Sequence, residues 1–379
     1  MRGVSALKKY LEEYKMKKIG IVGLALVIAI TILAIGCGGS GGGSSAGAAS
    51  GTVKGVYANL DPDRTYYLCS SHQAHTYFAD SHIALRYAAE YFNVKIVASG
   101  PDAWDTAAQA AAIEQAISRQ PAGIITRMWD NSPLDAIRQA RRAGVPVVVT
   151  ETRMGETNDD IGGALTYIGL DNYVCGRDTA RELVKHAGRS GNLVLMGNWG
   201  ASNTDAKRAG VEDYMKENEP GWTIIGYADD KADTAAAIEA GKSVINTYGN
   251  RPNLAIIGLD SSSGTGISMA MEELAVPAGK IAIVVHDREP STLDYIEKGY
   301  ISATLCNKTA TDEYLAILLM EDWNNGGLAN IPLSSDNAAA GINPVPDNMF
   351  NTAFAITAQN VRYFKAAVMP DVKTSLYNR

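Results

Sequence analysis

From about Tyr66 onward, short apolar runs alternate with longer segments in which apolar residues recur at helical spacing. The short runs predict strands over 65–70, 94–99, 122–128, 145–151, 165–171, 192–198, 222–228, 254–260, 280–287 and 301–307. The longer segments predict helices over 76–92, 105–120, 132–144, 172–188, 203–218, 233–248, 263–275 and 291–300. The alternation of strand and helix runs through two successive series.

Strands that are apolar throughout, each followed by a helix, favour parallel sheets that are covered by helices on both faces. Two such series indicate two similar α/β lobes. We therefore expect an α/β fold with two Rossmann-like lobes.

The residues that follow each predicted strand are candidate ligand contacts, because open parallel sheets bind ligands beyond the carboxyl ends of their strands. These segments mix carboxylates, amides, basic side chains and tryptophan. Such a lining suits a neutral polyol, whose hydroxyls need hydrogen bonds and whose C–H faces pack on aromatic rings. The segments are 70–77, 127–130, 151–153, 198–205, 229–233, 260–263, 286–288 and the single residue Asn307.

The first fifty residues have a different pattern. Two lysines precede an uncharged run over 19–36. The last residues of this run and Cys37, which follows it, read "LAIGC". The run is at the lower limit for a membrane-spanning helix, so a retained anchor is one alternative. The small residues before the cysteine instead resemble a bacterial lipobox, in which the chain is cleaved before a cysteine that becomes lipidated. We expect a lipoprotein signal over 1–36, with Met16 as the true start, and lipidation of Cys37.

The segment that follows Cys37 is rich in glycine, serine and alanine. Such a composition cannot bury apolar surface and is typical of a flexible tether. We expect 37–60 to hold an extracytoplasmic body at a membrane surface.

Composition and cysteine content exclude several classes of protein. The net charge of −7 offers no basic surface to a nucleic acid. Three cysteines remain beyond Cys37, and an odd number of cysteines cannot all pair in disulfides. We expect Cys69 and Cys306, in apolar surroundings, to be small buried residues.

Four local motifs resemble the type I periplasmic solute-binding proteins, which bind ribose, galactose, xylose and related sugars for ABC importers. They are "AGVPVVVTE", "YIGLDN" with "CGRDTARELV", "NTDAKRAGVEDY" and "HDREPSTLDYIEKGYISATLCN". The similarity extends over about Thr65 to Phe364.

The resemblance implies two lobes that are joined by three crossovers and close over a ligand by hinge motion. It implies an N-terminal lobe of 61–170 plus 308–345 and a C-terminal lobe of 171–307 plus 346–379.

Carried over residue by residue, the resemblance also implies a pocket. Tyr77 and Phe78 would contact a sugar ring, and Glu151 would accept hydrogen bonds from two hydroxyls. Thr152 separates Glu151 from Arg153, whereas the family's sugar binders often have arginine directly after the acid. The remaining expected contacts are His75, Trp129, Arg153, Asn203, Asp205, Lys207, Asp260, Asp287 and Asn307.

Two tryptophans and a group of histidines leave alternatives open. Trp129 and Trp199 each follow a strand, where they would either stack on a ligand or pack internally. His72, His75 and His82 lie within eleven residues, and a metal site is one interpretation of them. A metal needs three or four converging ligands, so we favour His75 as a pocket residue and expect no metal and no cofactor.

Catalysis and phosphate binding are weaker interpretations. Glu151 and Asp287 resemble the paired acids of glycosidases, but they lie on different lobes and no nucleophile motif accompanies them. "SGTGIS" opens a helix but lacks the lysine and spacing of a phosphate loop. We therefore expect a protein that is not an enzyme.

The expected function is that of a membrane-anchored, monomeric solute-binding protein that delivers a sugar or polyol to ABC permease subunits. One alternative is a signalling receptor for a furanose-like autoinducer or a chemoreceptor ligand. A sugar-processing or metal-dependent enzyme is the other alternative.

Overall fold

The computed structural model describes residues 61, 63–331, 340–365 and 369–379. The expected signal segment, the lipidated Cys37 and the tether lie outside these ranges. No helix within the described ranges is long and apolar enough to cross a membrane.

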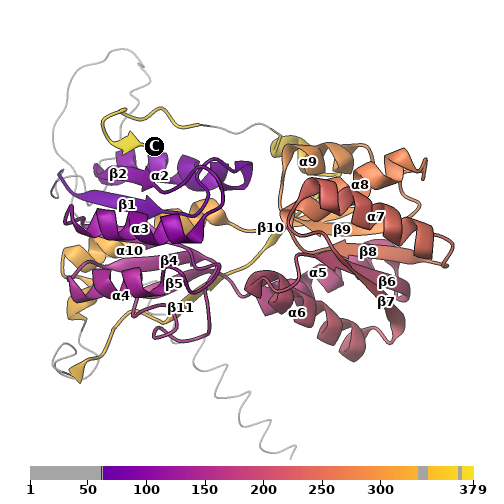
Figure 1. Ribbon diagram of the computed structural model, residues 1–379, viewed down its shortest axis with the longest axis horizontal. Helices are drawn as coiled ribbons and strands as arrows, with labels where there is room; N and C mark the ends of the chain where they lie inside the picture. Colours follow the sequence, from indigo (N-terminus) through magenta and orange to yellow (C-terminus); the bar gives the residue numbers. More distant parts are fainter. Residues whose placement is uncertain (1–60, 62, 332–339, 366–368) are drawn as a thin grey trace, which may run out of the picture. The chain divides into compact units, whose positions relative to one another are not determined.

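The ten expected strands all form, and they assemble into two mostly parallel sheets (Figure 1). The first sheet has the order β11-β5-β4-β3-β1-β2-β13, and the second has the order β12-β10-β9-β8-β6-β7. The expected α/β fold is therefore confirmed. The first sheet contains β1 (Thr65–Cys69), β2 (Lys95–Ser99), β3 (Gly123–Thr126), β4 (Val147–Glu151), β5 (Thr166–Leu170), β11 (Asn348–Asn351) and β13 (Tyr377–Asn378). The second contains β6 (Ser190–Gly197), β7 (Gly221–Asp229), β8 (Leu254–Gly258), β9 (Ala282–His286), β10 (Ala303–Cys306) and β12 (Phe354–Thr357).

Helices cover both faces of each sheet. On the first sheet, α2 (Ala79–Phe92) and α10 (Thr309–Asn324) bury one apolar cluster, and α3 (Thr106–Ile117) and α4 (Leu134–Arg142) bury the other. On the second sheet, one cluster lies beneath α7 (Thr234–Tyr248), α8 (Ser261–Glu273) and α9 (Pro290–Glu297), and the other lies beneath α5 (Asn172–Ala187) and α6 (Ser202–Asn218). Short 3₁₀ turns occur at η1 (Thr76–Phe78), η2 (Leu328–Asn330) and η3 (Val361–Tyr363).

Aspartates define where several helices begin. Asp105, Asp171, Asp233 and Asp260 each have extended backbone and accept a hydrogen bond from an amide in the first turn of α3, α5, α7 and α8, respectively. Each side chain thus satisfies a backbone donor that the helix itself leaves unpaired. The strand-to-helix turns that face the carboxyl edge of each sheet are consequently well defined.

The C-terminal part of the chain departs from the expected lobe boundaries. We expected 346–379 to belong to the second lobe, but β11 pairs with β5 and β13 pairs with β2, both in the first sheet. Only β12 joins the second sheet, antiparallel to β10. The chain therefore passes between the sheets a fourth time after η3, where three crossovers were expected. No strand was expected over 346–379, and the sheets that β11, β12 and β13 join are decided by tertiary pairing.

The helix α10 was also not expected. Its apolar residues Ala316, Ile317 and Met320 pack into the first lobe, but the same helix buries Asp312, Glu313 and Glu321. Buried acids on several sides hide the one-sided apolar stripe by which an amphipathic helix is identified.

The helices α5 and α6 touch through glycine. A Cβ atom on Gly176 would lie 2.0 Å from the carbonyl oxygen of Lys207, and one on Gly210 would lie 2.0 Å from that of Tyr173. The two backbones can approach this closely only because both residues lack a side chain. The contact determines where α6 presents its first two turns.

Replacing Gly176 with alanine should therefore lower the free energy of unfolding by about 1–3 kcal/mol, because the helices must separate to admit a methyl group. Urea denaturation followed by circular dichroism measures this change. Val174→Ala, on the exposed side of the same helix, is the matched control and should change the free energy by less than about 0.5 kcal/mol. Equal stability of the two variants would contradict the proposed contact.

Candidate functional site

A cavity of about 460 Å³ lies between the carboxyl ends of the two sheets. Both lobes contribute to its lining, and the lining residues lie in the segments that connect strands to the next helix or in the first turns of those helices. The residues are His72, His75, Tyr77, Phe78, Trp104, Trp129, Asn198, Ala201, Asn203, Thr204, Lys207, Lys231, Ala232, Asp260, Ser261 and Asp287.

Strand order explains why the cavity lies at this place. In the first sheet, β1 lies between β2 and β3, so the chain leaves β1 in one direction and β3 in the other. In the second sheet, β6 lies between β7 and β8 in the same way. Such reversals open a crevice beyond the carboxyl ends of the strands. The segments after β1, β6, β7 and β8, including the start of α6, supply most of the cavity wall.

Aromatic side chains form the first-lobe wall. His75 precedes η1 and accepts a hydrogen bond at Nδ1 from the Tyr77 amide at 3.1 Å, which shapes the turn that presents Tyr77 and Phe78. The Phe78 ring lies edge-to-face with Trp129 at 6.5 Å between centroids, and Trp129 lies at 5.4 Å from Trp104. The wall offers both flat faces and ring edges to the C–H surface of a ligand.

The two expected acids occupy corresponding places in the two lobes. Glu151 ends β4 and Asp287 follows β9, and both have left-handed backbone, with φ of 69° and 67°. This conformation is costly for a residue other than glycine and recurs at functional sites, although turns and helix ends such as Asn93 adopt it as well. The Tyr167 hydroxyl donates to the Glu151 carbonyl at 2.8 Å, and the Asp287 amide donates to the Leu305 carbonyl at 2.9 Å.

A smaller recess of about 20 Å³ adjoins these two acids. It is bordered by Tyr77, Trp129, Glu151, Thr152, Leu170, Asn172, Asn203, Lys207, His286, Asp287 and Asn307. The recess therefore brings Glu151 and Asn307 together with residues of the main cavity wall.

Several polar atoms around the cavity and its recess lack a protein partner. Among the described residues, Glu151 Oε1, Trp129 Nε1 and Asn307 Oδ1 are buried and make no hydrogen bond. A buried polar atom without a partner is costly, typically about 1–3 kcal/mol. A ligand that carries both hydroxyl donors and acceptors would remove this cost.

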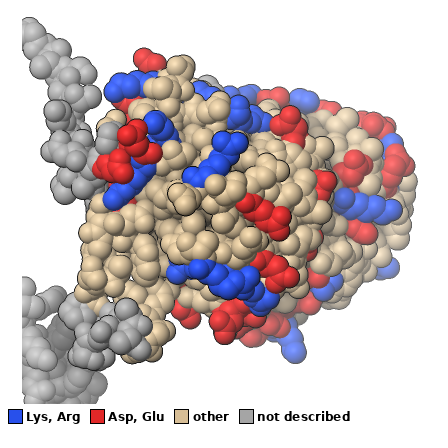
Figure 2. Space-filling model, turned by 60° about the vertical axis from the view of Figure 1, so that its left-hand side comes forward, with Lys and Arg blue, Asp and Glu red and all other residues tan. Residues whose placement is uncertain are grey.

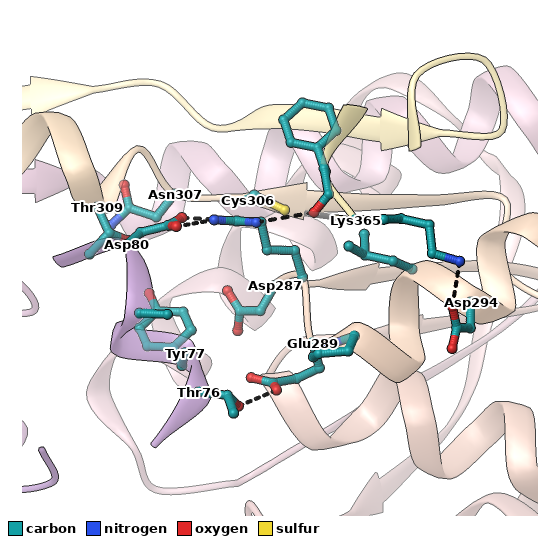
Figure 3. A pocket seen from close by; sticks show the side chains of 15 residues that line it. Thr76, Tyr77, Asp80, Asp287, Glu289, Asp294, Cys306, Asn307, Thr309 and Lys365 are labelled. Carbon is teal, nitrogen blue, oxygen red and sulfur yellow. Dashed lines mark hydrogen bonds and ion pairs between the residues drawn. The ribbon is translucent and has the colours of Figure 1, made fainter. Parts of the chain in front are cut away.

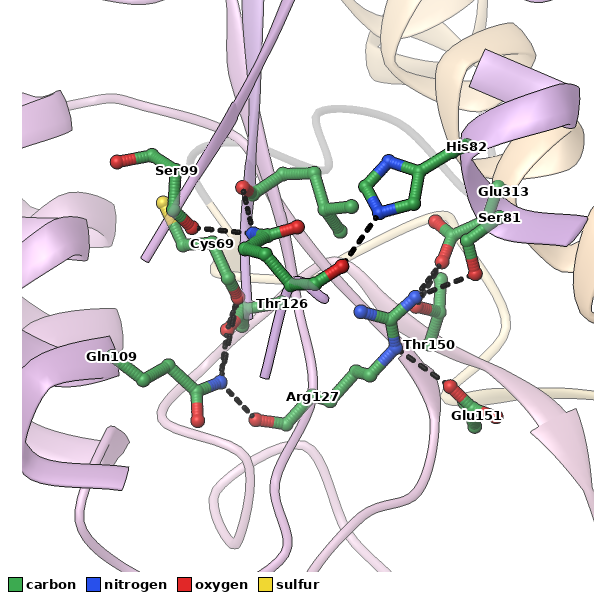
Figure 4. A network of polar contacts seen from close by, with 12 residues as sticks. Cys69, Ser81, His82, Ser99, Gln109, Thr126, Arg127, Thr150, Glu151 and Glu313 are labelled. Atoms are coloured by element: carbon green, nitrogen blue, oxygen red, sulfur yellow. Dashed lines mark hydrogen bonds and ion pairs between the residues drawn. The ribbon is translucent and has the colours of Figure 1, made fainter. Parts of the chain in front are cut away.

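A buried arginine lies behind the Glu151 carboxylate (Figure 4). Arg127 is fully buried, and its Nε donates to Glu151 Oε2 at 2.6 Å while its Nη2 donates to Glu313 Oε1 at 2.5 Å and to Ser81 Oγ at 2.7 Å. Burial lowers the pKa of Arg127, but the attraction of Glu313 and Glu151 outweighs it and the net shift is upward. The guanidinium therefore stays charged.

The second lobe contributes one buried cation and one capping acid. Lys207, on α6, is buried, and its Nζ donates to the Leu259 carbonyl at 3.4 Å. Asp260 accepts from the Asn198 amide at 3.0 Å and caps α8, so it links the loops after β6 and β8. Burial and the neighbouring Asp260 raise the pKa of Asp230 behind it.

Ten of the twelve ligand contacts expected from the sequence line the cavity or its recess. The two others do not: Arg153 binds the Asn348 side chain and the Thr157 carbonyl, and Asp205 accepts from the Gly200 amide and pairs with Arg208. Position along a strand-end loop says which side chains are near the edge but not which way each one points.

Two other residues considered from the sequence also lie elsewhere. His82, inside α2, is buried between the Tyr377 hydroxyl and the Gln73 carbonyl, and burial lowers its pKa to about 4. Trp199 packs under Arg208 and beside Tyr227 rather than lining the cavity. The described residues contain no group of three or more His, Cys, Asp or Glu side chains that could hold a metal. Cys69, Cys175 and Cys306 are buried free thiols, which confirms the expectation for Cys69 and Cys306.

Several lining residues were not singled out from the sequence. His72, Trp104 and Lys231 all line the cavity. Lys231 and His72 belong to strand-end segments that the topology indicated, so this signal was present. Trp104 follows β2 but is half exposed, at 55%, and nothing in its local pattern distinguishes it from a solvent-facing residue.

A second cavity of about 420 Å³ shares Tyr77 and Asp287 with the first and is crossed by contacts between the lobes (Figure 3). Asp80 pairs with Arg288, with the Nε to Oδ2 distance at 2.9 Å, and Thr76 donates to Glu289. Three consecutive residues thus have two different roles: Asp287 faces the first cavity, and Arg288 and Glu289 contact Asp80 and Thr76 of the opposite lobe.

Asp287 should make stability depend on pH. Burial is the main cause that raises its pKa to about 7; Glu151 adds to the effect and Lys207 opposes it. Because the folded state binds this proton more tightly than the unfolded chain, the stabilisation is complete below about pH 4 and is lost as pH rises through about 7. Asp287→Asn should therefore flatten the fall in unfolding free energy between pH 4.5 and 7.5, by about 3 kcal/mol.

Urea denaturation at a series of pH values measures this slope. Asp135→Asn, which removes an exposed acid on α4, is the control and should leave the slope unchanged. A slope that is the same in Asp287→Asn and in the parent protein would contradict the assignment.

Comparisons with known proteins agree with this architecture. Residues 66–326 match the family described as periplasmic binding protein domain. A sugar-binding protein of a sugar ABC transporter from Bacillus halodurans has 23% identity and a TM-score of 0.72, over 80% of this chain and 100% of its own. An arabinose-binding protein from Geobacillus stearothermophilus has 23% identity and a TM-score of 0.71 over the same shares.

A solute-binding protein of an ABC transporter from Agrobacterium vitis, with bound tagatopyranose, has 20% identity and a TM-score of 0.67, over 79% of this chain and 96% of its own. No curated protein matches the chain. At these identities the solved structures establish the shared fold, while the family match covers more than half of the sequence. The chain belongs to the periplasmic binding protein domain family, a family of extracytoplasmic solute-binding proteins that are not enzymes.

Proposed function

We propose that this protein captures a monosaccharide or a similar polyol between its lobes and delivers it to the permease of an ABC importer. The observation that carries the proposal is the set of unpartnered polar atoms, led by Glu151 Oε1, beside an aromatic wall. Carboxylate and amide oxygens accept from hydroxyls, and aromatic rings pack on the C–H face of a sugar. Solved structures of similar proteins contain bound arabinose, allose and tagatopyranose.

The charge distribution agrees with a neutral ligand. The cavity combines Lys207 and Lys231 with Asp260 and Asp287, so neither sign dominates. On the face drawn in Figure 2, acidic and basic side chains are interspersed. A strongly charged ligand would meet repulsion from one half of this lining.

Both lobes must hold the ligand for the proposal to work. Glu151 and the aromatic residues belong to the first lobe, whereas Asn203, Lys207 and Asp287 belong to the second. A bound sugar therefore bridges the lobes, and hinge closure would exclude water from its hydrogen bonds. A closed, loaded form gives a permease a shape that differs from the empty one.

The test is isothermal titration calorimetry against arabinose, xylose, galactose, allose and tagatose. At least one sugar should bind, and Glu151→Gln and Asp287→Asn should each weaken binding at least tenfold, because each replaces one carboxylate acceptor oxygen with an NH2 donor and removes the charge.

Asp205→Asn is the matched control, since Asp205 shares α6 with Asn203 and Lys207 but lies outside the cavity. Its affinity should stay within about twofold of the parent, whereas Asn203→Ala should weaken binding at least tenfold. Loss of binding in Asp205→Asn together with full binding in Asn203→Ala would contradict the assigned lining.

We also propose that Cys37 is lipidated and anchors the protein to the outer side of a membrane. The support is the sequence alone: an apolar run, small residues before the cysteine, and a glycine- and serine-rich tether after it. Multiple acyl chains on one cysteine would anchor a soluble body stably.

Palmitate labelling in a bacterial host tests the anchor. The parent protein should be labelled and should sediment with membranes, and Cys37→Ser should lose the label. Ser45→Ala, in the tether, should retain both properties. Labelling that persists in Cys37→Ser would refute lipidation at this residue.

A further inference from the structure

We infer that Arg127 is a positioning residue that sets the ligand-binding geometry of both Glu151 and Phe78. Arg127 is fully buried and does not line the cavity. The inference rests on the proposed function, because it concerns how the proposed sugar contacts are held in place.

Arg127 orients the carboxylate of Glu151. Arg127 Nε binds Glu151 Oε2 at 2.6 Å and leaves Oε1 buried without a hydrogen bond, beside the recess that Glu151 borders. The guanidinium therefore occupies one oxygen of Glu151 and orients the other as an acceptor. Charge-assisted bonds of this length fix orientation well.

Arg127 also contacts the aromatic ring of Phe78. The Arg127 guanidinium carbon lies 4.5 Å from the centroid of the Phe78 ring, which is a cation–π contact. Phe78 also lines the cavity. One cation thus supports an aromatic contact and a carboxylate contact of the same ligand site.

Three further contacts hold Arg127 itself in place. Its Nη2 binds Glu313 on α10 and Ser81 on α2, and its backbone carbonyl accepts from Gln109 Nε2 at 2.7 Å (Figure 4). Glu313 is fully buried, and burial raises its pKa against the opposing attraction of Arg127. Arg127 is therefore held at its guanidinium by α2 and α10 and at its backbone by α3, and none of these helices lines the cavity.

The geometry needs a guanidinium rather than any cation. Nε and Nη2 point to two different carboxylates while the planar group faces the Phe78 ring. A lysine ammonium is a point charge and cannot reproduce this fork. Arg127→Lys therefore keeps the charge while removing the orientation.

The experiment is a double-mutant cycle in the full chain, with the tightest-binding sugar of arabinose, xylose, galactose, allose and tagatose as the probe. Arg127→Lys should weaken binding about 10- to 100-fold. In a Glu151→Gln background, the same change should weaken binding by at most about threefold, because the oriented carboxylate is already lost and only the support of the Phe78 ring remains to be removed. Additive losses would overturn the inference, because a merely structural role does not depend on Glu151.

Arg64→Lys is the matched control. Arg64 pairs with the buried Glu321 at 3.1 Å, in the same lobe but at the opposite end of β1. Its replacement should lower the unfolding midpoint while leaving sugar affinity within about twofold. If Arg127→Lys does not fold, Glu313→Gln replaces it in the cycle, since it releases the same guanidinium from the other side. The expected pattern is the same, and additivity there would overturn the inference as well.

A ligand-free crystal structure separates this inference from the proposed function. If no sugar binds the parent protein, the proposed function fails. Arg127 is then judged by whether the Glu151 carboxylate and the Phe78 ring rotate in Arg127→Lys relative to the parent. Unchanged positions of both groups would overturn the inference.

Discussion

The first lobe depends on one buried ion cluster, in which Arg127 lies between Glu151 and Glu313. Removing three charged groups from water is expensive, and the loss of one member typically costs about 3–5 kcal/mol because the others stay buried and unpaired. An all-apolar arrangement would serve folding as well. The cluster joins β3, β4, α2 and α10 at the edge of the sheet where the cavity opens, so its position is explained by the site that it supports.

Both lobes use a strained acid at the same edge. Glu151 and Asp287 each have left-handed backbone after a strand, and this directs their side chains away from the sheet and toward the cavity. The residues that follow Asp287 contact Asp80 and Thr76 of the opposite lobe. The ligand site and the contacts between lobes are thus built from the same short segment, so a group that engages Asp287 lies directly beside the contacts that hold the lobes together.

The features that depend on interactions between residues close in the sequence could be predicted from the sequence. Apolar runs and helical spacing predicted ten strands and eight helices that all form. Ten of the twelve contacts that the sequence and the family resemblance implied line the cavity or its recess. The other two do not: Arg153 binds Asn348 and Thr157, and Asp205 binds the Gly200 amide and Arg208. Arg127 belongs to the strand-end segment 127–130, but its pairing with Glu313 could not be foreseen, because the two residues are 186 positions apart.

The sequence by itself determined the two-lobed α/β architecture and the loops that carry the site, because both follow from periodicity and from the ends of strands. Tertiary structure alone decided the return of β11 and β13 to the first sheet, since the strands that pair there are far apart in the sequence. It alone decided which loop side chains face the cavity. It alone brought Arg127, Glu151 and Glu313 together, because the pairing of buried charges depends on distances in space that no local spacing encodes.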